Sequence, residues 1–280
     1  RRDDHTLNPL PGASVRHKAP VLPFQMALPA LDAFPRKIWA QIGARCVRAT
    51  GVADMANPTA YGLESLRSAI ASYLQMARGI DCQPSQVFVT SGYRNTLTLI
   101  VHALLKPGDR VLVENPGYPP TRQLLEYLQI AVQHVAVDQD GMQVEQGVSA
   151  SLHARAAVVT PAHQSPLCMS LSLPRRLQLL EWARRERSWI IEDDYDGEYR
   201  YVSRPLPALK SLDRDGRVLY AGTFSKVLFP GIRLAYLVVP PAQVERFEHV
   251  SQTFLGGWPG LTQAILTTSV TEGHIPPPIL

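Results

Sequence analysis

Short apolar segments that alternate with helical patterns are the feature that most constrains the fold of this chain. Short, continuous apolar runs are typical of strands buried on both faces, and intervening helices are typical of crossover connections. Seven such segments occur, at residues 86–90, 110–114, 132–137, 156–160, 189–193, 218–221 and 234–239. We therefore expect an α/β fold built on a mostly parallel seven-stranded sheet with helices on both faces.

Helical spacing of apolar residues accounts for much of the remaining chain. One helix is expected to begin at Pro35, because proline suits the first turn of a helix, and a stronger one covers residues 62–78. Further helices are expected at residues 95–105, 119–128, 174–187 and 241–254. The proline-rich residues 1–30 lack this periodicity and predict a linker or an extended arm.

Composition excludes several classes of protein. Hydrophobic residues make up 45% and charged residues 19% of the 280 residues, a globular balance that rules out a disordered or collagen-like chain. The three cysteines form no C-x-x-C pair, so neither a disulfide framework nor a zinc site is indicated, and a reducing cytoplasm is expected. The sequence shows no signal peptide and no apolar stretch that could cross a bilayer. A net charge of +4 suits a phosphate-bearing small molecule as well as nucleic acid.

Polar side chains gather where the expected strands end, which is where open α/β sheets bind their ligands. The sequence Glu-Asp-Asp-Tyr-Asp at residues 192–196 closes the strand at residues 189–193. Carboxylates at a buried strand end are costly unless a cation faces them, so a solvated turn is the plain alternative to a binding site. A metal site is a further alternative, but no histidine lies close in the sequence to support one.

A lysine follows the strand expected at residues 218–221. Lys226 ends the sequence Gly-Thr-Phe-Ser-Lys and is flanked by Phe224 and Val227, an apolar setting that would lower its pKa. A desolvated lysine is what Schiff-base chemistry requires, whereas a lysine at a strand end more commonly faces solvent. Arg233 heads the next apolar strand, and a buried arginine calls for an anionic partner such as phosphate.

Two further loops complete this set of strand ends. Ser91-Gly92 leads directly into a helix whose N-terminal amides could bind phosphate, although the pair also fits a plain tight turn. Residues 115–119 present Tyr118 at the same edge, either for packing or for ligand contact. The chain has neither G-x-G-x-x-G nor a P-loop, so nucleotide binding has no support. An acid, a lysine able to form an aldimine, two phosphate binders and an aromatic ring together match one cofactor, pyridoxal 5′-phosphate (PLP).

The order of these motifs resembles that of a known family. The chain looks like a fold-type I, aspartate-aminotransferase-like PLP domain and, in finer detail, like the effector domain of the MocR family of GntR-type bacterial transcription regulators. The motifs that carry the resemblance span about residues 30–255 and include Leu-Asp-Ala-Phe-Pro at 31–35, Gly-Leu-Glu-Ser-Leu-Arg at 62–67, Val-Thr-Ser-Gly at 89–92, Glu-Asn-Pro-Gly-Tyr at 114–118, Thr-Pro-Ala-His-Gln at 160–164, Glu-Asp-Asp-Tyr-Asp at 192–196, Gly-Thr-Phe-Ser-Lys at 222–226 and Pro-Gly-Ile-Arg at 230–233.

The resemblance implies a role for each matching position. Lys226 would hold PLP as an internal aldimine and later shuttle the proton, while Asp193 would pair with the pyridine nitrogen. Tyr195 would hydrogen-bond the ring 3′-oxygen, and Tyr118 would stack on the ring. The implied phosphate ligands are Gly92, Tyr93, Ser225 and Arg233. His163 and Gln164 would line the cofactor pocket.

Several positions depart from the family's pattern. Asn57 occupies the place of a tyrosine that the family contributes to the partner's site, and Tyr61 is the candidate substitute. Ser-Pro-Leu-Cys at residues 165–168 stands where class I aminotransferases carry Asn-Pro-Thr-Gly. Arg94 stands where glutamine is usual, and it either reinforces phosphate binding or, as we slightly favour, faces solvent.

The resemblance also implies a domain organisation. An arm at residues 1–30 would precede a PLP-binding large domain at residues 31–255, and residues 256–280 would begin a truncated small carboxyl-terminal domain. Family members continue into that small domain, which supplies an arginine for the substrate carboxylate, and they carry an amino-terminal winged helix-turn-helix. We expect neither of these within the chain, so DNA would be reached only through a domain outside it. The site is expected at a homodimer interface, with no membrane partner.

Three functions remain open at this point. The first is an effector domain that senses an amino-acid-like ligand through aldimine chemistry on Lys226. The second is a class I aminotransferase that moves an amino group between an amino acid and a 2-oxo acid. The third is a degenerate relic that binds PLP poorly. The linker-like start and the pairing of Thr-Pro-Ala-His-Gln with Glu-Asp-Asp-Tyr-Asp favour the regulator.

Overall fold

The computed structural model describes residues 28–150, 153–196 and 207–274 of the chain. The arm expected at residues 1–30 therefore lies almost wholly outside the described residues, as does the end of the segment expected at residues 256–280. Within the described part of the chain, none of the helices is both long and apolar enough to cross a membrane.

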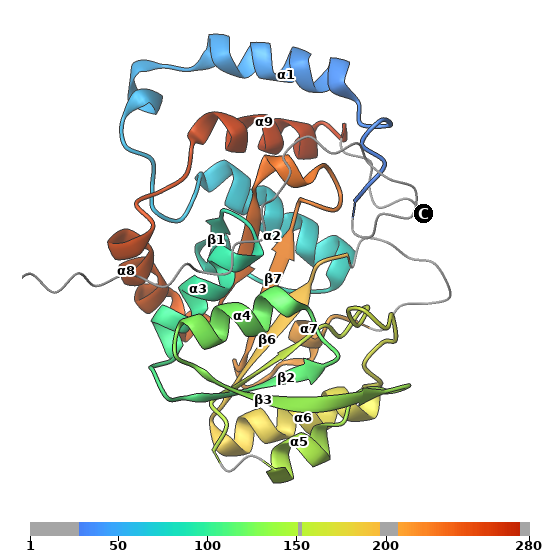
Figure 1. Cartoon of the computed structure of the whole chain (residues 1–280). Coiled ribbons are helices and arrows are strands. Elements are labelled where there is room, and N and C mark those ends of the chain that lie inside the picture. The colour runs from blue at the N-terminus through green and yellow to red at the C-terminus, as the bar shows by residue number, and fades with distance from the viewer. Residues whose placement is uncertain (1–27, 151–152, 197–206, 275–280) are drawn as a thin grey trace, which may run out of the picture.

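The fold is built on one mixed sheet whose central strands run parallel (Figure 1). Its strand order is β1-β8-β7-β6-β5-β2-β3-β4. The strands are β1 (Val87–Thr90), β2 (Arg110–Asn115), β3 (Ala131–Asp138), β4 (Gly141–Met142), β5 (Ala156–Val159), β6 (Trp189–Asp194), β7 (Val218–Thr223) and β8 (Ala235–Val238). Strands β3, β2, β5, β6 and β7 pair in parallel, whereas β8 is antiparallel to both of its neighbours.

All seven expected strands are present, and the α/β architecture is confirmed. The eighth strand, β4, is a two-residue element that pairs antiparallel with the end of β3. A Gly-Met pair forms no apolar run, so its pairing comes from the turn at residues 139–140 and not from a pattern in the sequence. The mostly parallel sheet thus gains one short edge strand.

Nine α-helices lie in the described part of the chain. They are α1 (Arg36–Ala49), α2 (Glu64–Arg78), α3 (Tyr93–Leu104), α4 (Pro119–Tyr127), α5 (Val144–Ala150), α6 (Leu173–Glu186), α7 (Leu209–Leu212), α8 (Val244–Phe254) and α9 (Gly260–Thr271). Four short 3-10 helices join them, η1 (Val52–Met55), η2 (Pro84–Gln86), η3 (Pro230–Ile232) and η4 (Pro241–Gln243). The helices expected from apolar spacing are present, while α5, α7 and α9 were not expected.

Helices cover both faces of the sheet, which explains why its strands are continuously apolar. Alternate residues of one strand enter different cores: Ile191 of β6 packs under α3, α4 and α8, and its neighbour Ile190 packs under α5 and α6. A third core lies between α2 and the strands β1, β7 and β8. Helix α9 packs against α2 and α1 and contributes Leu266 to this core (Figure 1). Burial on both faces favours β-branched and leucine side chains throughout a strand.

A buried arginine connects the loop after β5 to the rest of the fold. Arg176 of α6 is only 2% exposed. Its guanidinium donates hydrogen bonds to the backbone oxygens of Leu171 at 2.8 Å, Pro161 at 2.8 Å and Pro207 at 2.6 Å. Burial lowers the pKa of Arg176, and the nearby Glu192 opposes that shift. One side chain therefore fixes three segments that lead to or from the carboxyl edge of the sheet.

Replacement of this arginine tests how far the fold depends on it. Arg176→Leu removes the side-chain donor from the oxygens of Leu171 and Pro207 and leaves Pro161 with only the Leu171 amide, so we expect a loss of about 2 to 3 kcal/mol in the free energy of unfolding. Arg184→Leu on the same helix is the matched control, because Arg184 forms only an exposed pair with Glu181, and its loss should change the stability far less. Urea unfolding followed by circular dichroism measures both. Equal losses in the two variants would contradict this role of Arg176.

Candidate functional site

A cavity of about 400 Å³ opens at the carboxyl edge of the sheet. It is bounded by the segments that follow β1, β2, β6 and β7, where the sequence placed the polar residues. Eight of the ten predicted site residues line it: Gly92, Tyr93, Tyr118, Asp193, Tyr195, Ser225, Lys226 and Arg233. The fold thus brings together residues that are far apart in the sequence.

One end of the cavity is built to receive an anion. Gly92 caps the start of α3 with a φ of +88°, a conformation that suits glycine. A side chain at this position would place its Cβ 3.2 Å from the guanidinium carbon of Arg233, so glycine also lets that guanidinium approach. Arg233 donates a hydrogen bond to the backbone oxygen of Ser91 at 2.9 Å. The first-turn amides of α3 and this guanidinium form an anion-binding end.

A buried acid in the cavity wall suits a ligand group that is positively charged or carries an N–H. Asp193 lies near the end of β6, is 6% exposed, and receives no hydrogen bond from any described residue. Burial raises its pKa well above the ordinary value, nearby Asp194 and Glu114 raise it further, and Lys226 opposes them. A buried carboxyl group without a donor is costly. A ligand that carries an N–H group or a positive charge would relieve that cost.

Lys226 lies at the same edge, after β7. Burial lowers the pKa of its amine, while Asp196 and Asp193 partly counter that effect. Burial also lowers the pKa of Lys210, but that lysine lies on α7 at the other end of β7, where its Nζ donates to the backbone oxygen of Val218 at 2.6 Å. Lys226 is the one lysine among the described residues that line the cavity. The lowered amine pKa at the cavity therefore belongs to Lys226.

Aromatic side chains form part of the cavity wall. Tyr118 is 46% exposed, and its ring meets that of Tyr93 edge-on at 5.9 Å between centroids. The hydroxyl groups of Tyr93 and Thr121 are hydrogen-bonded at 2.8 Å, which fixes the Tyr93 ring. The pKa of Tyr195 is raised by burial and then by nearby Asp196, so its hydroxyl keeps its proton at neutral pH. Tyr195 is therefore a hydrogen-bond donor at this site.

Two predicted pocket residues lie behind the cavity wall. Gln164 is 1% exposed, and its amide nitrogen donates to Glu114, to the backbone oxygen of Pro116 at 2.8 Å and to that of Ser165 at 2.9 Å. His163 pairs its Nδ1 with Asp196 Oδ1 at 3.1 Å. Neither residue lines the cavity, because both side chains are held by neighbouring loops. Gln164 instead fixes the loop that presents Tyr118.

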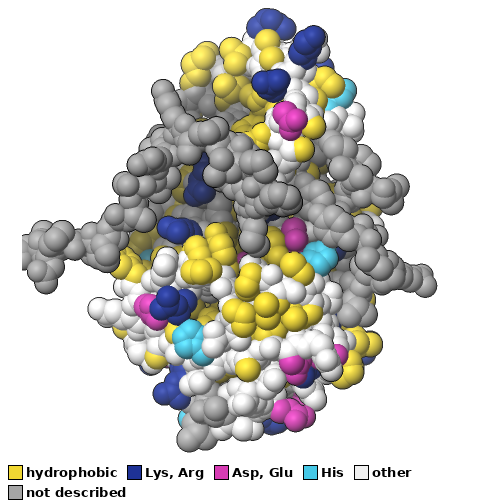
Figure 2. All heavy atoms as spheres, turned by 45° about the vertical axis from the view of Figure 1, so that its right-hand side comes forward, with side chains coloured by type: hydrophobic (Ala, Val, Ile, Leu, Met, Phe, Trp, Pro, Cys, Tyr) yellow, Lys and Arg dark blue, Asp and Glu magenta, His cyan; other side chains and the backbone are white. Residues whose placement is uncertain are grey.

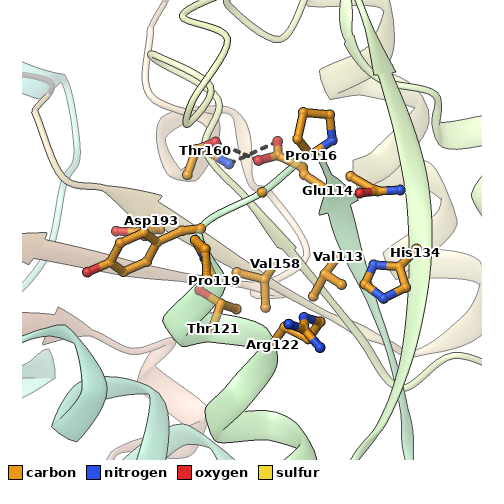
Figure 3. Close-up of a pocket in the computed structure, with 13 residues that line it drawn as sticks. Val113, Glu114, Pro116, Pro119, Thr121, Arg122, His134, Val158, Thr160 and Asp193 are labelled. Atoms are coloured by element: carbon orange, nitrogen blue, oxygen red, sulfur yellow. Dashed lines mark hydrogen bonds between the residues drawn. The ribbon is translucent and has the colours of Figure 1, made fainter. Parts of the chain in front are cut away.

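Figure 3 shows a second hollow, of about 180 Å³, that shares lining residues with the first. Asp193 and Tyr118 line both hollows. In the second hollow, Val113 and His134 are register neighbours on β2 and β3, and Arg122 approaches from α4. Arg122 and His134 were not singled out in the sequence, since an exposed arginine on a helix and an exposed histidine on a strand carry no distinctive pattern.

Comparison with known proteins identifies the family. A family model described as aminotransferase class I and II matches residues 39–275. The chain belongs to this family. The probable rhizopine catabolism regulatory protein MocR of Rhizobium meliloti is similar to the chain: the two are 36% identical over 252 residues, which cover 90% of this chain and 50% of that protein. The HTH-type transcriptional regulator TauR of Rhodobacter capsulatus is 41% identical over 207 residues, which cover 73% of this chain and 42% of TauR.

Solved structures of aminotransferases share the architecture of this family member. The α-aminoadipate aminotransferase LysN of Thermus thermophilus, solved with N-(5′-phosphopyridoxyl)-L-leucine, superposes with a TM-score of 0.80 at 28% identity, over 88% of this chain and 63% of LysN. The expected PLP fold-type I architecture and the expected resemblance to MocR-type regulators are both confirmed. The chain spans about half the length of the curated regulators it matches, or less.

The pair formed by His163 and Asp196 predicts a pH-dependent contribution to stability. The hydrogen bond to Asp196 raises the pKa of His163 above its ordinary value of 6.5; Asp196 and Asp194 raise it through their charge, whereas burial and Arg78 lower it. Because the folded-state pKa is raised, the stabilisation is complete below the unfolded pKa and is lost as the pH rises through the folded one.

Asp196→Asn tests this pair. The variant should lose more stability at about pH 5.5 than at about pH 8.5, and the NMR titration of the His163 ring should move to lower pH. An unchanged His163 titration in the variant would contradict the assignment.

Proposed function

We propose that this chain is the PLP-binding effector part of a MocR-type transcription regulator, which senses an amino-acid-like ligand at Lys226. One observation carries the proposal: a single cavity joins a desolvated lysine, a buried acid without a donor and an anion-binding end. These three features match the aldehyde, the pyridine nitrogen and the phosphate of PLP. The family membership and the similarity to MocR and TauR support it.

When bound, PLP supplies an aldehyde that captures amines and a ring that withdraws electrons from them. Asp193 would accept a hydrogen bond from the protonated pyridine nitrogen, a donor that it lacks among the described residues. Arg233, Ser225 and the amides of Gly92 and Tyr93 would hold the phosphate. Held at these two ends, the cofactor would take its orientation from residues of this chain.

Lys226 and the tyrosines would act between these two ends. The lowered pKa of Lys226 favours the neutral amine, the form that attacks a carbonyl carbon. The same amine could also hold a proton beside the ligand, because nearby Asp196 and Asp193 raise its pKa and favour the protonated form. Tyr195 would donate its hydroxyl proton to a ring oxygen, and Tyr118 would cover the ring face.

The proposal extends to partners and domains outside the described site. We infer that DNA is contacted through a helix-turn-helix domain beyond this chain, because the matched regulators are about twice its length or longer. On the one face that Figure 2 shows, basic and acidic side chains of the described residues are interspersed. A homodimer, a large domain at residues 31–255 and the start of a small domain at residues 256–280 complete the proposal.

A second candidate function is catalysis of amino-group transfer. It is favoured by the likeness to LysN, whose name states that activity and whose structure covers 88% of this chain. The residues proposed to hold PLP would serve sensing and transfer equally well, since both need the same lysine amine, buried acid and anion-binding end. Turnover is therefore the observation that separates the two functions.

Absorbance of the PLP-loaded chain tests the role of Lys226. Wild-type protein mixed with PLP should turn yellow, and Lys226→Ala should lose the lysine-dependent visible band. Lys210→Ala is the matched control, because Lys210 is also buried but lies away from the cavity, and it should retain the band. An unchanged band in Lys226→Ala would overturn the site assignment.

A turnover assay separates the two functions. The regulator proposal predicts that amino acids change the visible spectrum of the PLP-loaded chain without sustained production of glutamate from 2-oxoglutarate. Steady glutamate production over many turnovers would favour the aminotransferase. Chromatographic measurement of glutamate checks this, with Lys226→Ala as the blank.

A further inference from the structure

Arg94 is a charged residue that the proposed cofactor contacts leave unused. It is the second residue of α3 and lies in the same first turn as Tyr93. The side chain is exposed, yet it lines the large cavity together with Gly92 and Arg233. The sequence slightly favoured a solvent-facing role for Arg94, and the structure gives it both a solvent-accessible side and a place in the cavity wall.

The position of Arg94 is electrostatically unfavourable without an anion. The N-terminus of a helix carries a partial positive charge, so a cation in the first turn is repelled. Arg233 adds a second full charge, because its guanidinium lies against Gly92 at that same terminus. Neither arginine forms an ion pair with a described residue. The local charge therefore calls for an external anion.

The cavity as a whole has the same imbalance. Among the described residues that line it, Arg94, Lys226 and Arg233 are basic, and Asp193 is the one acidic residue. Asp193 is the electrostatic partner of Lys226, because Asp193 raises the pKa of Lys226 and Lys226 lowers that of Asp193. The guanidinium groups of Arg94 and Arg233 have no carboxylate partner among the described residues. Two positive charges at a helix N-terminus match a dianion better than a monoanion.

We propose that Arg94 is a second phosphate ligand, which binds the PLP phosphate jointly with Arg233 and the first-turn amides of α3. This proposal rests on the proposed function, because it assigns Arg94 to the cofactor. The three terminal oxygens of a phosphate offer more acceptor positions than Arg233 satisfies, and that arginine already shares one of its nitrogens with the backbone oxygen of Ser91. Arg94 would close the exposed side of the anion-binding end.

Binding of PLP and of pyridoxal, which lacks the phosphate, tests this role. The cofactor-free chain is titrated with each compound in wild-type protein, Arg94→Gln and Arg94→Lys. We expect Arg94→Gln to weaken PLP binding about tenfold, the loss of one partly exposed charge-assisted contact, and to leave pyridoxal binding unchanged. Arg94→Lys should fall between the two, because lysine keeps the charge but not the planar donor pair.

Arg36→Gln is the matched control for these variants. Arg36 is the first residue of α1, is exposed, and is not among the residues that line the cavity. It should bind both compounds as wild type does. If Arg94→Gln binds PLP as tightly as Arg36→Gln, the proposal is wrong. It is also wrong if Arg94→Gln binds PLP normally but loses affinity for amino acids, since Arg94 would then bind the ligand carboxylate.

Inorganic phosphate separates a failure of this proposal from a failure of the proposed function. If the wild-type chain does not bind PLP, the proposed function fails. Inorganic phosphate then probes the anion-binding end by itself, through the rise it causes in the Tm of the cofactor-free chain. A rise that Arg36→Gln keeps and Arg94→Gln loses supports Arg94 as a phosphate ligand, and equal rises in both variants overturn it.

Discussion

The site depends on one buried carboxyl group, that of Asp193. Strand β6 is apolar on both faces up to Ile191, and its continuation places Asp193 out of water with no hydrogen-bond donor among the described residues. Such a group raises its pKa or finds a cationic partner. Lys226 provides charge nearby, and the cavity provides room for a ligand that carries an N–H. The buried carboxyl group of Asp193 lowers the stability of the fold, and it leaves a hydrogen-bond acceptor available to a ligand.

The loops around this acid are held by buried polar side chains. Gln164 fixes the segment before Tyr118, and Arg176 fixes the loop after β5 through three backbone oxygens. Each of these residues has its hydrogen bonds satisfied within the protein, in contrast to Asp193. The difference separates residues that support the site from those that are left available to a ligand.

Much of the fold and part of the site could be predicted from the sequence. Lys226 and Asp193 were predicted together because both follow buried strands, and parallel strands end at one edge of the sheet. The two-residue strand β4 was missed, since pairing across a turn leaves no apolar pattern. Gln164 was expected in the cavity wall, but the direction of a loop side chain depends on the surrounding backbone. For the same reason, the sequence did not reveal that Arg94 lies in that wall.

Reduction of the PLP-loaded chain with borohydride tests the central claim most directly. The reagent makes the bond between a lysine and PLP permanent, and mass spectrometry of the digested protein then locates the modified residue. The account predicts the adduct on the peptide that contains Lys226. An adduct mainly on Lys210, or spread evenly over several lysines, would show that the cavity at the carboxyl edge of the sheet is not the PLP site.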